Sequence, residues 1–139
     1  MSSLAGLYRR LESKNDQAEP LYQRALSIRE KALGKNHSLV GRSLNDLAAV
    51  NAALGKYEKV EPMYRRALSI TKKTLGKDHP DVAIILSNIA SLYKTQGKYE
   101  ESAILYQQAL AILKTRFPNG HPNIDGLTNA YNKLKFKIN

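Results

Sequence analysis

The chain has 139 residues, enough for one compact domain or one short repeat array, and it lacks cysteine, which excludes disulfide scaffolds, thiolate zinc sites and cysteine nucleophiles. Its 22 Lys and Arg exceed its 12 Asp and Glu, so the net charge of +10 favours an acidic partner without choosing between nucleic acid, acidic peptide and anionic membrane. No run approaches the roughly 18 to 20 apolar residues of a membrane span and no secretion signal is recognisable, so we expect a cytoplasmic protein.

Apolar residues at helical spacing predict about seven amphipathic helices along the chain. Gly34 and Gly76 suit a left-handed C-cap, because that conformation favours a residue without Cβ. Pro80 and Pro122 suit a first helical turn, where a missing N–H is tolerated. The polar residues just upstream of these prolines are capping candidates: Asp78, His79, Asn119 and His121. In chain order, the expected helices are residues 1–11, 16–33, 38–53, 57–75, 80–95, 99–116 and 122–137.

The sequence repeats itself at a shift of 42 residues. Residues 19–28 return at 61–70 and, more loosely, at 103–112. Positions 19–60 and 61–102 share 20 identities in 42, where average amino-acid usage gives roughly three. Helix pairs of fixed length cannot each bury their own apolar face, so they stack on their neighbours. The period therefore predicts an all-α fold, a right-handed superhelical solenoid of antiparallel helix pairs.

The same period predicts how the chain is organised and packed. We expect one domain over residues 1–139, with repeats at about 1–37, 38–79 and 80–121 and a capping helix at 122–137. Small residues recur where we expect helices to approach closely, at Ala25, Ala67 and Ala109. Tyrosines recur where we expect a wedge into the adjoining repeat, at Tyr22, Tyr64 and Tyr106.

Two copies of the repeat carry a recognisable pattern of apolar, small and aromatic residues. The pattern residues are Leu44, Leu47, Ala48, Gly55, Tyr57, Tyr64 and Ala67 in one copy, and Leu86, Ile89, Ala90, Tyr93, Gly97, Tyr99, Tyr106 and Ala109 in the next. On these residues the chain resembles the tetratricopeptide repeat over nearly its whole length. Its period and its Leu-Gly-Lys-Asp-His-Pro corner at 75–80 resemble the kinesin-light-chain subtype. The first copy departs from the pattern, because Ser13-Lys14-Asn15 replaces the Gly-Lys-Tyr corner.

Motifs that would carry chemistry are absent or explained by the repeat. His79-Pro80-Asp81 matches the J-domain tripeptide, but the other copies of this slot read His37-Ser38-Leu39 and His121-Pro122-Asn123, which identifies a repeat corner. Histidines in successive helix layers lie roughly 10 Å or more apart and cannot share a zinc ion, whose ligands lie at about 2.1 Å. No phosphate loop, nucleophile elbow or dinucleotide fingerprint is recognisable, so we predict no enzymatic activity, no metal and no cofactor.

The resemblance implies that the first helix of each pair lines a concave groove that binds the partner. Asn and Ser side chains in such a groove can pair with an extended peptide backbone, and Arg and Lys can hold carboxylates. We therefore predict a protein-binding adaptor for an acidic peptide. Its predicted groove residues are Arg42, Asn45, Ser87, Asn88, Ser91, Lys94, Asn129 and Lys133, with Arg9, Arg10, Ala49 and Ala52 completing the row.

Two alternatives stay open at this point. One is a basic solenoid that binds nucleic acid, which the many basic residues on the outward second helices disfavour. The other is a homo-oligomer formed by end stacking, since the imperfect first repeat leaves an end where a second chain could stack. The sequence predicts no membrane partner and does not name the protein partner.

Overall fold

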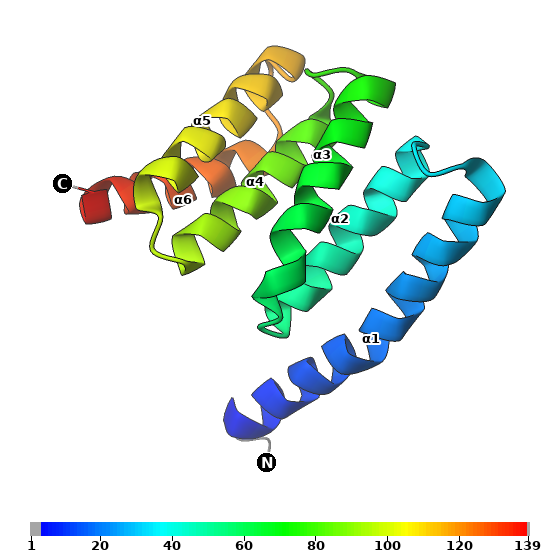
Figure 1. The fold of residues 1–139 in the computed structure, drawn as a ribbon. Coiled ribbons are helices and arrows are strands. Elements are labelled where there is room, and N and C mark those ends of the chain that lie inside the picture. Colours follow the sequence, from blue (N-terminus) through cyan, green and yellow to red (C-terminus); the bar gives the residue numbers. More distant parts are fainter. Residues whose placement is uncertain (1–3, 139) are drawn as a thin grey trace. The chain divides into compact units, whose positions relative to one another are not determined.

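The computed structural model describes the backbone of residues 4–138 and the side chains of residues 14–138. All regular structure within that range is helical (Figure 1). The elements in chain order are α1 (Leu4–Leu33), α2 (Ser38–Ala53), the 3-10 turn η1 (Tyr57–Lys59), α3 (Val60–Leu75), α4 (Pro80–Thr95), α5 (Tyr99–Arg116) and α6 (Pro122–Ile138). The helices pack as antiparallel pairs, so the predicted all-α solenoid fold is confirmed.

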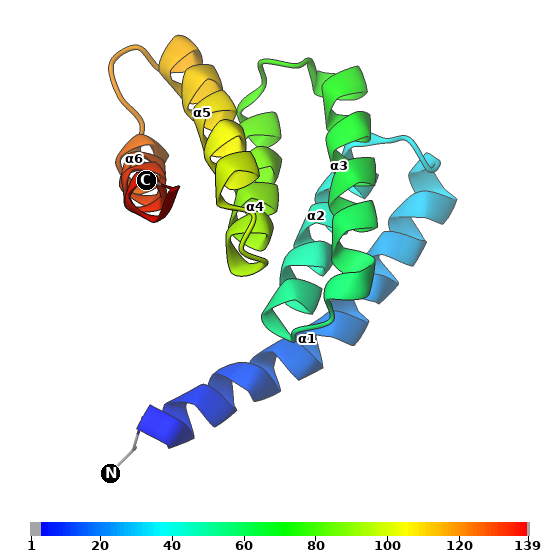
Figure 2. The same ribbon diagram turned by 60° about the vertical axis from the view of Figure 1, so that its left-hand side comes forward.

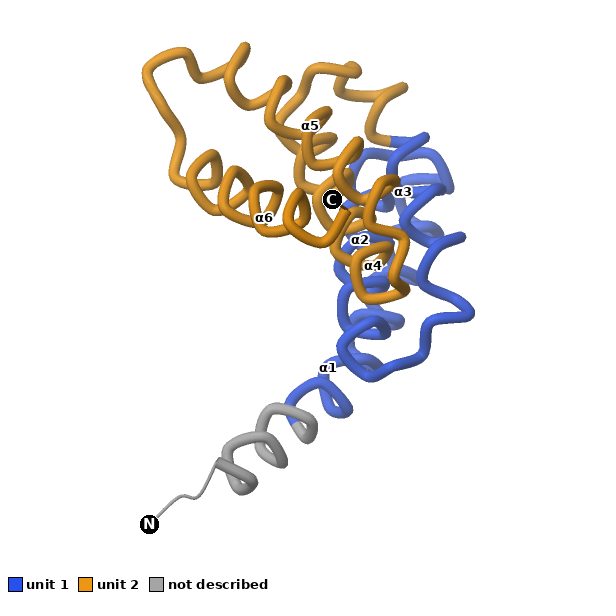
Figure 3. Tube along the Cα trace, turned by 90° about the vertical axis from the view of Figure 1, so that its left-hand side faces the viewer, with its two compact units in different colours: residues 1–70 blue, residues 71–139 orange. Residues whose placement is uncertain are grey.

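The chain forms two compact units, Met1–Ile70 and Thr71–Asn139 (Figure 3). The predicted single domain with repeat boundaries near residues 37, 79 and 121 stays a prediction.

The first helix differs from the sequence expectation. We predicted two helices, at 1–11 and 16–33, but α1 runs without a break from Leu4 to Leu33. The later corners turn at Gly55 and Gly97, whose φ angles are 78° and 82°, a left-handed conformation that glycine adopts without strain. Ser13-Lys14-Asn15 offers no glycine at this point, so the chain stays helical. The part of the chain described here therefore has six α-helices, not seven.

Each repeat corner ends in a histidine that caps the next helix. The Nδ1 atom of His79 accepts a hydrogen bond of 3.0 Å from the backbone N–H of Asp81. The Nδ1 atoms of His37 and His121 do the same, at 3.1 Å, for the second residue that follows each. Among the capping candidates, the histidines are thus the residues that cap. These bonds occupy one otherwise unpaired N–H at the start of α2, α4 and α6.

In the unit of residues 1–70, α1 is joined to α2 and α3 by polar contacts. The Arg29 guanidinium donates to Ser43 Oγ at 2.8 Å and to the carbonyl of Leu39 at 3.3 Å. Arg66 of α3 forms an ion pair of 3.6 Å with Glu30 of α1. These polar contacts occupy the side of α1 that faces its two neighbours in this unit.

In the unit of residues 71–139, α5 lies between α4 and α6 in the packing order (Figure 2). The buried Ser102 hydroxyl donates to the carbonyl of Ala90 at 2.6 Å and ties α5 to α4. Tyr106 of α5 packs in one buried cluster with Ala90 of α4 and Leu134 of α6. This arrangement confirms the predicted role of Tyr106 as a wedge between neighbouring helices.

The repeated small and aromatic residues are not buried equally. Ala67, Ala109, Tyr64 and Tyr106 are buried as predicted. The prediction that Tyr22 is a buried wedge is wrong, because its side chain is exposed on α1. The reason is that, among the described residues, α1 packs mainly against α2 of the following repeat, whereas Tyr106 has partners from both sides.

Candidate peptide-binding surface

The predicted groove residues fall on the first helix of each predicted pair, but in two units. Arg42 and Asn45 lie on α2, in the unit that ends at residue 70. The other six lie in the second unit: Ser87, Asn88, Ser91 and Lys94 on α4, and Asn129 and Lys133 on α6.

The α2 part of the surface carries a carboxylate that the sequence analysis did not include. Arg42 is exposed and Asn45 is half-buried, and Asp46 follows Arg42 by one helical turn. Burial raises the pKa of the Asp46 carboxyl, while the positive charges of Arg42 and Arg29 act in the opposite direction. This part of the surface therefore carries a carboxyl beside its arginine and is not simply basic. The spacing of four residues between Arg42 and Asp46 was the available signal for it.

The α4 part of the surface is a row of polar side chains along one helix face. Ser87, Ser91 and Lys94 follow one another at intervals of four and three residues, so they share that face. The Ser87 hydroxyl donates to the carbonyl of Ile84 at 2.8 Å, and Ser91 hydrogen-bonds the side chain of Tyr106. Burial raises the pKa of Tyr106, and its bond with Ser91 lowers it by a smaller amount. Both hydroxyls are thus held in place by the fold and keep acceptor lone pairs for a ligand.

The α6 part of the surface presents Asn129 and Lys133, which are exposed and one helical turn apart. Two nearby lysines, Lys135 and Lys137, instead contact aromatic rings. Lys135 lies over the Tyr131 ring, 4.8 Å from its centroid, and Lys137 lies over Tyr99 at 5.2 Å. Contacts of this kind draw the ammonium groups toward the aromatic faces.

A pocket of about 290 Å³ opens beside the α4 row, between α4, the end of α5 and the start of α6. Its lining is mostly apolar: Ala83, Ile84, Ser87, Leu113, Pro122, Asn123, Gly126 and Leu127. Ser87 is the one predicted groove residue among them. The pocket was not predicted from the sequence, although Ile84, three residues before Ser87 on the predicted groove face, was an available signal.

Among the described side chains of residues 14–138, no three His, Asp or Glu residues come together as a metal-binding group. None of the helices between residues 4 and 138 combines the length and apolar character needed to cross a membrane.

The fold defines a helical-repeat protein, and sequence comparison identifies its family. The tetratricopeptide repeat model matches residues 1–73 and 61–115, so the chain belongs to the tetratricopeptide repeat family. Domains of this family are generally protein–protein interaction modules and are typically non-catalytic. No protein of curated function gives a significant sequence match.

Solved structures similar to this chain include kinesin-light-chain-like repeat proteins, which confirms the predicted resemblance. BtubC (BKLC) from P. vanneervenii superposes with a TM-score of 0.77 at 25% identity, covering 96% of this chain and 53% of its own. A kinesin-light-chain-type protein of Podosopora anserina with nearly identical TPR-like repeats gives a TM-score of 0.78 at 23% identity, covering 92% of this chain and 62% of its own. The present chain therefore spans about half to three-fifths of these relatives.

Proposed function

We propose that this chain is a non-catalytic adaptor that holds an extended acidic peptide along the first helices of its repeats. The single observation that carries the proposal is the polar row of α4 with an apolar pocket at one end and Lys94 at the other. Along this row, the serine hydroxyls can hydrogen-bond a peptide backbone, the pocket can hold an apolar side chain, and Lys94 can attract a carboxylate. A reducing compartment such as the cytoplasm is the matching location, because the chain has no cysteine.

The spacing of the row sets the form of the peptide. Ser87 at the pocket and Lys94 are seven residues apart on one helix, about 10.5 Å at ~1.5 Å per residue. An extended peptide advances ~3.3 Å per residue, so this distance spans about three peptide residues. The matching ligand carries an apolar side chain and, about three residues away, an Asp or Glu.

The remaining predicted residues lie on α6 of the same unit and on α2 of the other unit, and in our proposal each helix supplies its own contacts. Asn129 and Lys133 of α6 are exposed and supply an amide and a second positive charge. Arg42 and Asn45 of α2 supply an equivalent pair. Asp46 follows Arg42 by one helical turn and offsets part of its positive charge, so in the proposal α4 and α6 supply the main charge contacts with an acidic peptide.

The proposal is tested by measuring peptide affinity by fluorescence anisotropy, after selecting a tight binder from a library of apolar-x-x-acidic peptides. Lys94→Glu combined with Lys133→Glu is expected to weaken binding by tenfold or more, since two favourable charge contacts become repulsive. The control is Lys114→Glu together with Lys72→Glu, which makes the same charge change at exposed positions on the second helices. Equal weakening in both variants would show that only the overall charge matters and would refute the site.

The pocket is tested separately from the charges. Ile84→Ser is expected to weaken a peptide with an apolar anchor but not one in which that anchor is alanine. Nucleic acid is the rival ligand in the same assay. A single-stranded oligonucleotide that binds more tightly than any selected peptide at about 150 mM salt would overturn the peptide proposal.

A further inference from the structure

Gly126 is a glycine that neither the backbone nor the packing of its unit requires. It lies inside α6, Pro122–Ile138, whereas the corner glycines adopt positive φ angles between 78° and 109°. A β-carbon at Gly126 would meet no heavy atom within 4 Å beyond its own helical turn. Glycine weakens a helix interior relative to alanine, because it has more conformational freedom to lose on folding. The fold of this unit therefore gives no reason for a glycine at position 126.

The open space at Gly126 belongs to the pocket beside the polar row of α4. Gly126 lines this pocket of about 290 Å³ together with Ile84 and Leu113. Leu113 is buried by the fold, whereas Ile84 stays 41% exposed. An apolar side chain that enters the pocket would remove this exposed surface of Ile84 from water, which is favourable.

The repeat shows which residues occupy the same position in the earlier first helices. One period before Gly126 the position holds Ile84 on α4, and two periods before it holds Arg42 on α2. Both residues have long side chains, so α6 is the helix in which this position carries none. Because Gly126 lines the pocket, a side chain at this position would occupy part of its volume.

The size of the pocket fits one side chain of a ligand. Sites for whole small molecules have volumes of roughly 300 to 1,000 Å³, and this pocket lies at the lower end of that range. Each methylene group that a ligand buries contributes about a fourfold gain in affinity. The volume left free at position 126 therefore acts on the choice between a small and a large apolar side chain.

We infer that Gly126 determines the size of the apolar side chain that the pocket accepts, and that it selects a large one, of leucine or phenylalanine size. The inference rests on the proposed function, because it concerns the anchor of the peptide held along α4. Gly126 acts here as a specificity residue: it leaves room for the anchor, and a longer side chain in its place narrows the pocket.

The selectivity is tested with three versions of the selected peptide, whose anchor is alanine, leucine or phenylalanine. The parent protein is expected to bind the phenylalanine version about tenfold or more tighter than the alanine version. Gly126→Leu is expected to remove this preference by weakening the phenylalanine version, with the alanine version within about twofold of the parent. Asn132→Leu is the matched control, since Asn132 is exposed on the same helix and does not line the pocket. A preference that persists in Gly126→Leu, or one that Asn132→Leu also removes, would overturn the inference.

Gly126→Ala separates specificity from stability. Alanine is the better helix former, so the midpoint of urea unfolding is expected to rise. Its added methyl group is expected to weaken the phenylalanine version about fourfold. A lower midpoint would show that the fold itself needs glycine at this position. A higher midpoint with unchanged affinity would show that the pocket does not use the space, and either result would contradict the role of Gly126.

A probe without any acidic group distinguishes failure of this inference from failure of the proposed function. N-acetyl-phenylalanine amide is expected to give saturable NMR shifts at the backbone amides of Gly126 and Leu127, and N-acetyl-alanine amide is not. Gly126→Leu is expected to abolish the shift at Leu127. Absence of these shifts in the parent protein would overturn the size selection, whatever the peptides show. If the shifts occur but Lys94→Glu leaves every peptide affinity unchanged, the acidic-peptide proposal fails and the size selection stands.

Discussion

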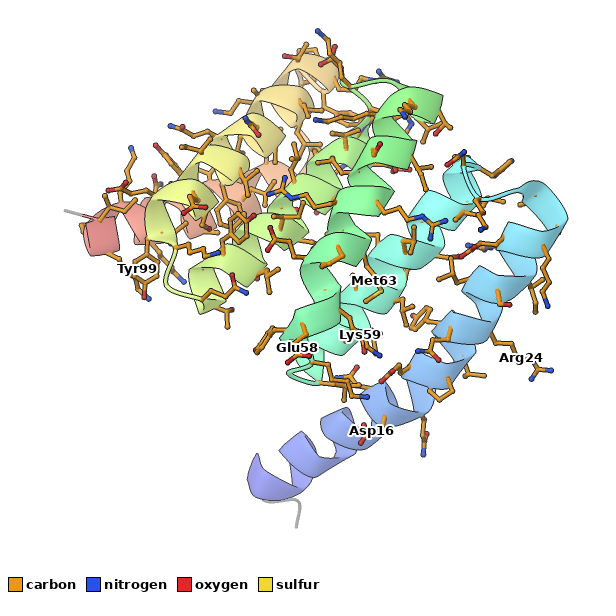
Figure 4. The ribbon with its side chains drawn as sticks, viewed as in Figure 1. Asp16, Arg24, Glu58, Lys59, Met63 and Tyr99 are labelled. Carbon is orange, nitrogen blue, oxygen red and sulfur yellow. The ribbon has the colours of Figure 1, made fainter. Side chains whose placement is uncertain are left out.

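Arg29 of α1 donates to the Ser43 hydroxyl of α2 at 2.8 Å, in a slot that Thr71 and Leu113 fill in the two later repeats. The charged residue also reaches the carbonyl of Leu39, so one side chain joins α1 to α2 at two points. Arg29→Ala is expected to lower the free energy of unfolding by about 1 kcal/mol, because a charge-assisted hydrogen bond and packing area are lost. Urea unfolding of the variant measures this loss. Arg24→Ala is the control, since Arg24 projects from α1 into solvent (Figure 4); an equal loss there would contradict the role of Arg29.

Asn51 of α2 is buried, and its Oδ1 atom has no hydrogen-bond partner among the described residues. An unpaired buried acceptor costs about 1 to 3 kcal/mol, and the same slot in the next repeat holds Tyr93. Asn51→Leu is therefore expected to raise the free energy of unfolding by about 1 kcal/mol, measured by urea unfolding. Asn51→Asp should instead destabilise the protein, because it buries a charge. A Leu variant less stable than the parent would show that the amide is satisfied in solution.

Tyr64 makes the protein sensitive to alkaline pH. Burial raises its pKa from 10.0 to about 12 in the folded chain. Between these values the folded state keeps a proton that the unfolded state releases, so the free energy of unfolding falls as pH rises through this window. The stability contribution is complete below pH 10 and is lost by about pH 12. Denaturant midpoints measured from pH 8 to 11.5 should fall more steeply for the parent than for Tyr64→Phe, and parallel curves would contradict this assignment.

His79 caps α4 with its Nδ1 atom, 3.0 Å from the N–H of Asp81. His79→Ala is expected to cost about 1 kcal/mol, the usual loss for removing an N-cap side chain. His79→Asn should retain most of the stability, because its carbonyl oxygen is also a good capping acceptor. Hydrogen exchange of the first turn of α4 measures the effect where it occurs. Equal exchange in the Ala and Asn variants would mean that the cap bond does not stabilise this helix.

Most of the fold depends on signals that are local in the sequence, so it could be predicted from the sequence alone. The period of 42, the glycines that end helices and the histidine and proline corners each act within a few residues. They therefore predicted five helices, α2 to α6, close to their observed bounds. The polar row of α4 followed from helical spacing alone. The family resemblance adds a prediction of which face of each helix binds a partner.

Tertiary structure decided what depends on residues far apart in the sequence. The repeat places Tyr22 of α1 and Tyr106 of α5 at the same position of their helices. Only the packing of neighbouring helices decides that Tyr22 is exposed and Tyr106 is buried. The pocket at Ile84 exists because Leu113 and Leu127 approach it from two other helices. The positions of Arg29 and Asp46 are likewise set by the contact of α1 with α2. Local propensity fixes a helix and its faces, whereas burial and charge depend on which other helix covers each face.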